Sequence, residues 1–571
     1  MELGLVGSGP AAEALRAACG DVELSVQEYD PTALSDGSEL PPIGAVVAPA
    51  GAGVFEAATT AFERWVAVEI GGIGGRPLTE IDATVSLYAP GSACYRCLRQ
   101  RVAANADGEP ASEARGSRNE VRLAGAVAGR ELIGLLSGDR SGGRTVEIPW
   151  QTRQLLAVPS CDCERSSPDH QLSLSHRSVD VDEALARGEG AVDDRVGLLS
   201  QVGERESFPV PYYIAQTADT SGFSDAQAAQ FAAGVDSDWN RAYMKAIGEG
   251  LERYSAGVYR RGDLRGGSEQ TLSNPVSPRR FVRPDSKEEP ELQDRIKWID
   301  GVDLQTDQNV KLPAEFVCFP PPTRRYRPAI TTGLGLGNST VEAVLSGIYE
   351  VIERDATMLS WYSTFEPLGL AVEDSVFAEL EKRASAESLT VTSLLVTQDI
   401  DVPVVAVAVY REGEWPNFAV GSGGNLDPTA AARSALAEAL QNWMELRAMG
   451  REQAAAEKAA IGEYADFPEP AQQFVDCEST IPVGSLGEPD LEGSEELDTV
   501  CERMADVGLD SYAARLTTRD VAALGFEAVR IVVPAAQPLF TGEPYFGERA
   551  NSVPQSLGFE PTLDGPYHPY P

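Results

Sequence analysis

The sequence GLGNSTVEAVLSGIYEVIER, residues 335–354, joins a glycine and a cap-forming Asn-Ser-Thr to a helix pattern that ends in two glutamates and an arginine. Two other stretches align with it, GVDSDWNRAYMKAIGEGLER at 234–253 and GGNLDPTAAARSALAEALQN at 423–442. In each, small residues follow the first glycine by eight and twelve positions, an acid follows by fifteen, and a Glu or Gln follows by eighteen. The pattern therefore predicts a repeated unit in which a glycine turn leads into a helix.

The acids of the first two units occur in pairs three residues apart, Glu249 with Glu252 and Glu350 with Glu353. Residues at this spacing share one face of a helix, so two such helices side by side would converge four carboxylates. Converging carboxylates stay ionised only with cations between them, and oxygen ligands without His or Cys favour Mg²⁺. The small residues would let these helices approach closely, and amides at the glycine turns would suit phosphate. We therefore expect a Mg-nucleotide site.

A single ExxER motif is most often a solvated helix face with paired charges. Here apolar residues flank the glutamates and the unit recurs with its glycine, which favours a site. The sequence contains neither GxxxxGK[ST] nor the kinase HRD and DFG motifs. We therefore expect the nucleotide to be held outside the common phosphate loops.

The composition narrows the classes of function. The 571 residues include 87 Asp and Glu against 47 Lys and Arg, a net charge of −40, which disfavours nucleic-acid partners and is typical of a halophilic proteome. A chain of this length with 43% hydrophobic residues predicts two or more domains. The sequence shows neither an apolar run of bilayer length nor a signal peptide, so we expect a cytoplasmic protein without membrane partners. Three His residues leave few bases for a Ser/His/Asp centre.

The N-terminal residues show a second pattern. An apolar strand at 3–6, the turn GSGPAA at 7–12, a helix and a second strand that ends near Glu28 and Asp30 indicate a nucleotide-binding βαβ unit. The alternative is that the glycines only make a tight turn. A polar stretch at 166–194 is expected to be a linker, and residues 195–571 to form a larger domain that ends in an extended Pro-rich tail.

The repeats carry a family resemblance. AIGEGLERYSAG at 246–257, TTGLGLGNSTVEAVLSGIYEVIERDA at 331–356 and AAARSALAEALQNWMELR at 430–447 resemble the three signature helices of the YcaO superfamily. The resemblance covers most of 195–571. It implies an ATP- and Mg²⁺-dependent cyclodehydratase that phosphorylates a backbone amide oxygen, so that a neighbouring Cys, Ser or Thr forms thiazoline or oxazoline in a ribosomally made precursor peptide. Thioamide formation with a sulfide-delivering partner, and a nonenzymatic accessory or scaffold protein, are the alternatives. A dehydrogenase partner and a homodimer are also expected.

The resemblance also implies roles for individual residues. The expected Mg²⁺ ligands are Glu249, Glu252, Glu350 and Glu353, and the residues expected around the nucleotide are Arg253, Arg354, Arg433, Glu438 and Gln441. Glu350, Glu353 and Arg354 are the candidate catalytic residues. Ring-forming members commonly end in a PxPxP-like tail that reaches the active site, and this chain keeps only the final PxP, Pro569 and Pro571. These prolines are further catalytic candidates, His568 is a candidate proton carrier, and a disordered tail without a catalytic role is the alternative.

The N-terminal region has its own resemblance. GSACYRCLRQR at 91–101, with the opening glycine turn, resembles the zinc-carrying ThiF-like domains that accompany YcaO proteins. The resemblance implies a docking domain at 1–165 with structural Zn²⁺ held by Cys94, Cys97, Cys161 and Cys163. A metal-free remnant with unpaired cysteines is the alternative. The expected fold class is α/β (α+β), with a YcaO-type domain of repeated glycine-turn and helix units preceded by a small Rossmann-like ThiF-type domain.

Overall fold

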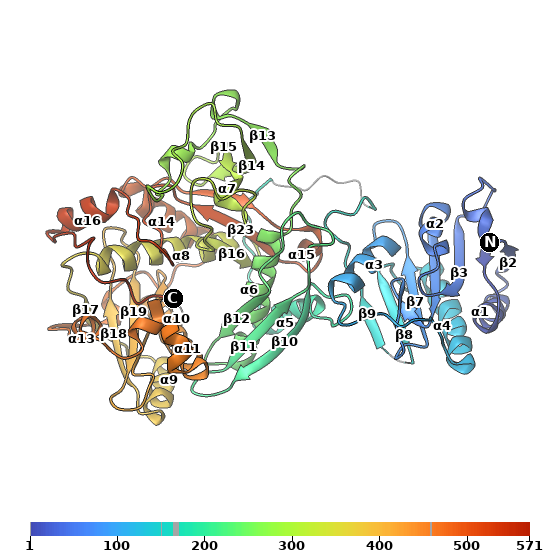
Figure 1. Cartoon of the computed structure of the whole chain (residues 1–571), viewed down its shortest axis with the longest axis horizontal. Helices are drawn as coiled ribbons and strands as arrows, with labels where there is room; N and C mark the ends of the chain where they lie inside the picture. The colour runs from blue at the N-terminus through green and yellow to red at the C-terminus, as the bar shows by residue number, and fades with distance from the viewer. Residues whose placement is uncertain (1, 150, 164–170, 457–459) are drawn as a thin grey trace.

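The structure is a computed structural model that describes residues 2–149, 151–163, 171–456 and 460–571. Figure 1 shows the N-terminal residues, in blue, at one end of an elongated molecule, and the later sheets and helices at the other. The chain mixes helices with parallel and antiparallel strands, which confirms the expected α/β class. In the described part of the chain, none of the helices combines the length and apolar character needed to cross a membrane.

A seven-stranded sheet, ordered β2-β1-β3-β4-β7-β8-β9, forms the N-terminal part. The first four strands in this order are parallel neighbours, and the last three are joined antiparallel. Helices α1 and α4 pack on one face of the sheet, and α2 and α3 pack on the other. The bounds are β1 (Glu2–Val6), α1 (Pro10–Gly20), β2 (Ser25–Tyr29), β3 (Ile43–Pro49), α2 (Val54–Ala61), β4 (Arg64–Ile70), β5 (Gly72–Ile73), β6 (Arg76–Pro77), β7 (Ala83–Tyr88), α3 (Tyr95–Ala104), α4 (Arg118–Ser137), β8 (Arg144–Ile148) and β9 (Gln151–Gln154).

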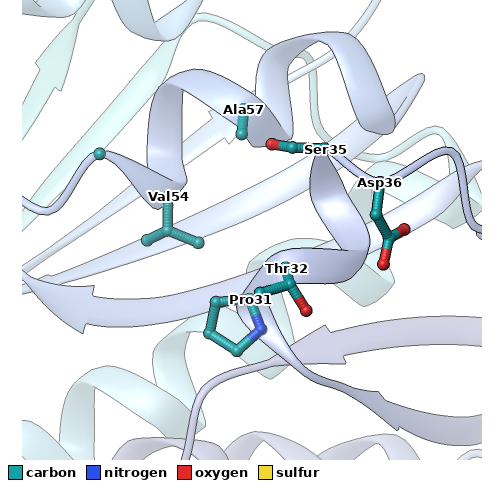
Figure 2. A pocket seen from close by; sticks show the side chains of 7 residues that line it. Pro31, Thr32, Ser35, Asp36, Val54 and Ala57 are labelled. Atoms are coloured by element: carbon teal, nitrogen blue, oxygen red, sulfur yellow. The ribbon is translucent and has the colours of Figure 1, made fainter.

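The predicted strand, glycine turn, helix and strand are β1, the residues before α1, α1 and β2. Gly7 has φ +116°, and a Cβ there would lie 2.2 Å from the carbonyl oxygen of Val47, so packing alone requires this glycine. A hollow of about 510 Å³ opens beyond the ends of β2 and β3 (Figure 2). Its lining comes from 31–36 and 53–57 rather than from the glycine turn. The structure thus gives the turn a structural reason that needs no nucleotide.

Residues after 195 form three further main sheets with helices packed against them. A three-stranded sheet has the order β10-β11-β12, a six-stranded sheet has β13-β14-β22-β23-β16 with β15 beside β14, and a five-stranded sheet has β20-β19-β18-β17-β21. The strands are β10 (Leu199–Glu206), β11 (Tyr212–Thr217), β12 (Phe231–Val235), β13 (Arg265–Gly267), β14 (Ile296–Asp303), β15 (Asn309–Pro313), β16 (Leu334–Gly337), β17 (Leu368–Ala371), β18 (Thr390–Leu395), β19 (Val404–Tyr410), β20 (Phe418–Gly424), β21 (Thr480–Pro482), β22 (Tyr512–Arg515) and β23 (Glu527–Val532). The helices are α5 (Val181–Gly188), α6 (Trp239–Gly257), α7 (Ala314–Val317), α8 (Thr340–Trp361), α9 (Ser375–Ala386), α10 (Pro428–Met449), α11 (Arg451–Ala456), α12 (Ala460–Tyr464), α13 (Glu469–Val475), α14 (Gly493–Asp506), α15 (Arg519–Ala523) and α16 (Arg549–Leu557).

The sequence repeat is a strand followed by the helix that packs on it. The three units are β12 with α6, β16 with α8 and β20 with α10, and each belongs to a different sheet. The repeated glycines lie within the strands, which corrects the expectation of glycine turns at the helix N-termini. A Cβ on Gly335 would lie 2.1 Å from the carbonyl oxygen of Ala343, and one on Gly234 would lie 2.3 Å from that of Ala242. The small residues therefore bring each helix close to its own strand rather than to another helix.

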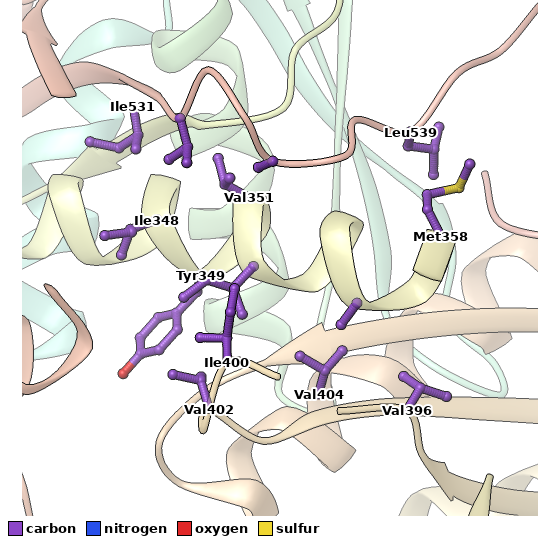
Figure 3. Packing of buried hydrophobic residues seen from close by; sticks show 14 of the residues in the cluster. Ile348, Tyr349, Val351, Met358, Val396, Ile400, Val402, Val404, Ile531 and Leu539 are labelled. Atoms are coloured by element: carbon purple, nitrogen blue, oxygen red, sulfur yellow. The ribbon is translucent and has the colours of Figure 1, made fainter. Parts of the chain in front are cut away.

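Helix α8 is the most enclosed of the three repeat helices. Figure 3 shows Ile531 of β23 on one side of the helix and Val404 of β19 on the other. The two sheets thus meet across α8, and sixteen of its 22 residues are buried. Charged residues on such a helix are held in low-dielectric surroundings.

Part of the stretch expected to be a linker is folded. Residues 164–170 lie outside the described residues, but 181–188 form α5, which packs on α6. The backbone N–H of Ser175 donates a hydrogen bond of 2.7 Å to Thr340 Oγ1 at the start of α8. One apolar cluster also joins Leu98 of α3 to Leu251 of α6. The N-terminal sheet and the repeats therefore share packed contacts.

Candidate active site

The acid at the fifteenth position after each repeated glycine folds back onto the strand before its helix. Its carboxylate accepts a backbone N–H in all three units: Ala233 donates to Glu249 at 2.5 Å, Gly333 to Glu350 at 2.9 Å and Ser422 to Glu438 at 2.6 Å. The N–H fixes one oxygen of each carboxylate beside the strand. The repeat thus gives equivalent acids equivalent positions.

Arg354 links the second and third units. Its guanidinium nitrogens lie 3.7 Å from Oε1 of Glu353 and 3.7 Å from Oε1 of Glu438. The hydroxyl of Ser422 donates a 2.7 Å hydrogen bond to the same Glu353 oxygen. One guanidinium nitrogen of Arg354, Nη1, is buried without a hydrogen bond. Since a guanidinium offers five N–H donors, Arg354 retains capacity for an anionic ligand.

The carboxylates form one cluster around Glu350. Burial raises the pKa of Glu249, Glu252, Glu353 and Glu438, and the nearby Glu350 charge raises each of them further. The pKa of Glu353 rises to about 7 despite the opposing charge of Arg354. These five carboxylates outnumber the arginines that pair with them, Arg253 and Arg354, and a bound cation would offset the remaining negative charge.

The arrangement of the carboxylates suits Mg²⁺ that is shared with a nucleotide better than an ion that is held by protein ligands alone. Within the described ranges, one group of possible metal ligands has all its ligand atoms within 4.8 Å of one another, and it consists of Cys94, Cys97, Cys161 and Cys163. The carboxylates of the repeat helices do not form so tight a group and are more widely spread. Mg²⁺ is usually held by one or two carboxylates together with water and substrate phosphates. Spread carboxylates with a neighbouring Arg therefore suit Mg²⁺ bound with a nucleotide.

Of the remaining expected nucleotide residues, Arg253 and Gln441 contact acids of α6 and α10, whereas Arg433 pairs elsewhere. Arg253 pairs with Glu249 and donates to the carbonyl of Phe231 at 2.7 Å. The amide of Gln441 donates to Glu445 at 2.9 Å. Arg433 is not in contact with the carboxylates of α6 or α8, because its guanidinium pairs with Asp374, the N-cap of α9.

Two charged residues near the cluster escaped the sequence pattern. Glu445 accepts a hydrogen bond from the Tyr212 hydroxyl at 2.7 Å and lies seven residues after Glu438, a helical spacing that could have revealed it. Arg530 is 2% exposed, and its charge acts on Glu252. Burial and the adjacent Arg327 lower the pKa of Arg530 to about 9. A lone Arg within the apolar strand EAVRIV was the available signal.

The C-terminal tail is packed inside the molecule. Nε2 of His568 lies 2.7 Å from the carbonyl oxygen of Phe540. Burial lowers the pKa of His568 to about 4. Pro569 is buried, Pro571 is half-buried, and Tyr570 is 1% exposed. Burial and the neighbouring Glu353 raise the pKa of the Tyr570 phenol. The tail is therefore held beside the carboxylate cluster, whereas the His568 ring is held against the backbone.

The four cysteines of the N-terminal pattern lie together. The sulfur separations are 3.9 Å for Cys94 and Cys97, 3.6 Å for Cys94 and Cys161, and 3.7 Å for Cys97 and Cys163. Zn–S bonds of about 2.3 Å in a tetrahedron place sulfurs roughly 3.8 Å apart. The thiols therefore match the geometry of a closed tetrathiolate zinc site.

The comparisons with known proteins identify the family. A family model described as YcaO cyclodehydratase, ATP- and Mg²⁺-binding, matches residues 233–537. The chain belongs to the YcaO family. The match spans all three strand and helix units and the acids that they carry.

Several known proteins are similar to this YcaO chain. An uncharacterised protein of Methanothermobacter thermautotrophicus is 26% identical over 374 residues, which are 61% of this chain and 91% of the relative. A structure of a heterocyclase in complex with substrate and cofactor has a TM-score of 0.74 at 18% identity, and the match covers 99% of this chain and 84% of that one. The heterocyclase TruD has a TM-score of 0.66 at 17% identity over 98% and 82% of the two chains. These two structures therefore share the fold over nearly the whole chain.

Proposed function

We propose that this YcaO protein is an ATP- and Mg²⁺-dependent cyclodehydratase that forms thiazoline or oxazoline in a ribosomally made precursor peptide. The observation that carries the proposal is the convergence of equivalent acids from three strand and helix units around Glu350, with Arg354 between α8 and α10. A buried excess of carboxylates beside an Arg with an unused N–H donor fits Mg²⁺ and phosphate together.

The chain's residues would prepare a nucleotide for transfer to the peptide. Glu249, Glu252, Glu350 and Glu353 would hold Mg²⁺, and Arg354, Arg253, Glu438 and Gln441 would line the nucleotide. Arg433 would join them only by exchanging its partner Asp374 for the nucleotide. ATP supplies a phosphoryl group that converts the amide oxygen into a leaving group. Arg354 would stabilise negative charge on the transferred group through Nη1, which is buried without a hydrogen bond in the described structure.

The tail favours ring formation over thioamide formation. The Glu353 charge acts on the phenol of Tyr570, the residue between Pro569 and Pro571. A tail at the active site is the feature that the family resemblance associates with ring-forming members. We therefore assign the prolines to closing the peptide site, while the reacting charges belong to Glu350, Glu353 and Arg354.

The N-terminal region would dock the peptide rather than react with it. Residues 1–165 form the proposed docking domain with Zn²⁺ on Cys94, Cys97, Cys161 and Cys163, and 195–571 form the proposed catalytic domain. The zinc site would be structural, because four sulfurs leave no open position. Leu98 of α3 and Leu251 of α6 belong to one apolar cluster, and Arg101 donates to the Tyr254 hydroxyl, so the two regions share a core.

Calorimetric titration of Mg-ATP tests the proposal directly. We expect saturable binding to the wild type and a loss of at least about 100-fold in affinity or turnover for Glu350→Gln, which removes charge and keeps shape. Glu379→Gln, on the exposed face of α9, is the matched control and should bind as the wild type does. Equal binding by both variants would refute the carboxylate assignment.

Mass spectrometry of a peptide incubated with the protein and Mg-ATP then identifies the reaction. Loss of one water per modified residue is the expected result. Exchange of one oxygen for sulfur would instead require the thioamide reaction. Nucleotide binding with no change in any peptide would favour the nonenzymatic accessory role.

A further inference from the structure

A second cavity lies where the N-terminal region meets the end of α6. It has a volume of about 320 Å³ and is separate from the carboxylate cluster. Its walls combine the loop just before Cys161, the C-terminal end of α6, and α15, which Figure 1 shows at the junction between the two ends of the molecule. Small-molecule sites typically have volumes of about 300–1,000 Å³ and often lie at such boundaries.

Most of the cavity wall is apolar and buried. Phe223, Leu264, Ile299 and Leu516 line it, and each is at most 8% exposed. Ala256, on the last turn of α6, adds a small side chain that leaves room for a ligand. An apolar group that enters the cavity would leave water, and this burial of apolar surface would favour binding.

The polar part of the lining contains three arginines, Arg260, Arg515 and Arg519, and one carboxylate, Asp263. Arg515 is paired with Glu527, and Arg519 donates to the carbonyl oxygen of Val158, so Arg260 is the candidate to meet an anion. Among the described residues, the side chain of Arg260 has a long ion pair of 3.7 Å to Asp225 and a 3.3 Å hydrogen bond to Ser160. Its side chain is 42% exposed, so N–H donors remain for an anion.

A buried hydroxyl on the same wall lacks a partner. Thr518 lines the cavity and is 8% exposed, yet its Oγ1 makes no hydrogen bond in the described structure. Buried hydroxyls are normally paired with protein, water or ligand. The cavity thus offers an unused hydrogen-bonding group as well as charge.

We propose that this cavity binds a small amphipathic anion, with an apolar body against Phe223 and Ile299 and one carboxylate or sulfonate facing Arg260. The shape and lining support an aromatic or branched aliphatic acid. The site needs neither ATP nor a peptide, so it stands apart from the proposed catalytic function.

Fluorescence of 8-anilinonaphthalene-1-sulfonate, an apolar aromatic sulfonate, tests the site in the full-length protein. Arg260→Glu should weaken binding at least about 10-fold by reversing the charge at the mouth. Ala522→Trp should abolish the saturable signal, because Ala522 is exposed and lines the cavity, and the larger side chain would fill it. Arg261→Glu is the control, since the exposed Arg261 is outside the lining and should leave binding unchanged.

Displacement of the dye by 4-phenylbutyrate and by 4-phenylbutanol separates charge from apolar contact. The acid should displace the dye at concentrations at least about 10-fold lower than the alcohol. Circular dichroism of each variant checks that it is folded. Equal competition by acid and alcohol, or dye binding unaffected by both Arg260→Glu and Ala522→Trp, would overturn the proposal.

Discussion

Arg101 and Asp520 form an ion pair with both side chains fully buried, although 419 residues separate them in the sequence. The Tyr254 hydroxyl also donates to Asp520 at 2.7 Å and accepts from Arg101 at 3.1 Å. Arg101 lies one turn after Cys97 on α3, and Tyr254 lies two residues after Glu252 on α6. The cysteine cluster and the carboxylate helix are therefore joined through one buried polar network.

Breaking this pair should destabilise the whole protein. Asp520→Asn would leave the Arg101 charge buried without a counterion, at a cost of about 3–5 kcal/mol in the free energy of unfolding. Denaturant unfolding measures the loss. The exposed pair Arg16 and Glu28 provides the control, because Glu28→Gln should change stability by less than about 1 kcal/mol. Equal small effects of both substitutions would show that the buried pair is not needed.

Replacing one thiol should release the proposed metal. We expect the purified wild type to contain stoichiometric zinc and Cys94→Ser to lose it, since three thiolates and a hydroxyl bind Zn²⁺ less well. Elemental analysis gives the readout. Cys477→Ser alters a cysteine away from the cluster and should keep the zinc. Retained zinc in Cys94→Ser would exclude that ligand.

A methyl group at a repeated glycine should separate a strand from its helix. In Gly335→Ala the new Cβ would lie 2.1 Å from the carbonyl oxygen of Ala343, and overpacking of this kind costs about 1–3 kcal/mol. Thermal unfolding tests the expected destabilisation. Gly203→Ala places a methyl on β10 with no atom within 4 Å and should leave the melting temperature unchanged or slightly raised. A Gly335→Ala protein as stable as Gly203→Ala would contradict the packing argument.

Acid should weaken the packing of the tail through His568. Burial lowers its pKa from 6.5 to about 4, so the unfolded chain binds the proton more readily and stability falls as pH drops from about 6.5 towards 4. At pH 5 the contribution lost is about 2 kcal/mol relative to pH 7. The measurement is the difference in unfolding free energy between the wild type and His568→Asn at the two pH values. A difference that does not vary with pH would show that His568 is not buried as a neutral ring.

Removing the last three residues should reduce turnover without unfolding the protein. Deletion of 569–571 removes Tyr570 from beside Glu353, and loss of such positioning costs up to about 100-fold in rate. Peptide turnover and Mg-ATP binding are measured together. Reduced turnover with retained nucleotide binding is expected, whereas unchanged turnover would leave the tail a structural role only.

The sequence alone determined the repeat and the family. Glu249, Glu350 and Glu438 each lie fifteen residues after a repeated glycine. Residues at equal spacings along a helix share the same face, so these acids occupy equivalent positions. The order of strand, glycine turn, helix and strand predicted the βαβ opening. The fold class and the grouping of Cys94, Cys97, Cys161 and Cys163 came from the family resemblances.

Only the tertiary structure decided what the repeats pack against. The glycines proved to be strand residues that contact their own helices, since the pattern of small residues does not say which backbone approaches them. Arg530 and Tyr570 joined the cluster from distant segments, and Asp520 met Arg101 across the chain. Such contacts depend on how sheets stack around α8 and α6, which is a property of the whole core rather than of any local spacing.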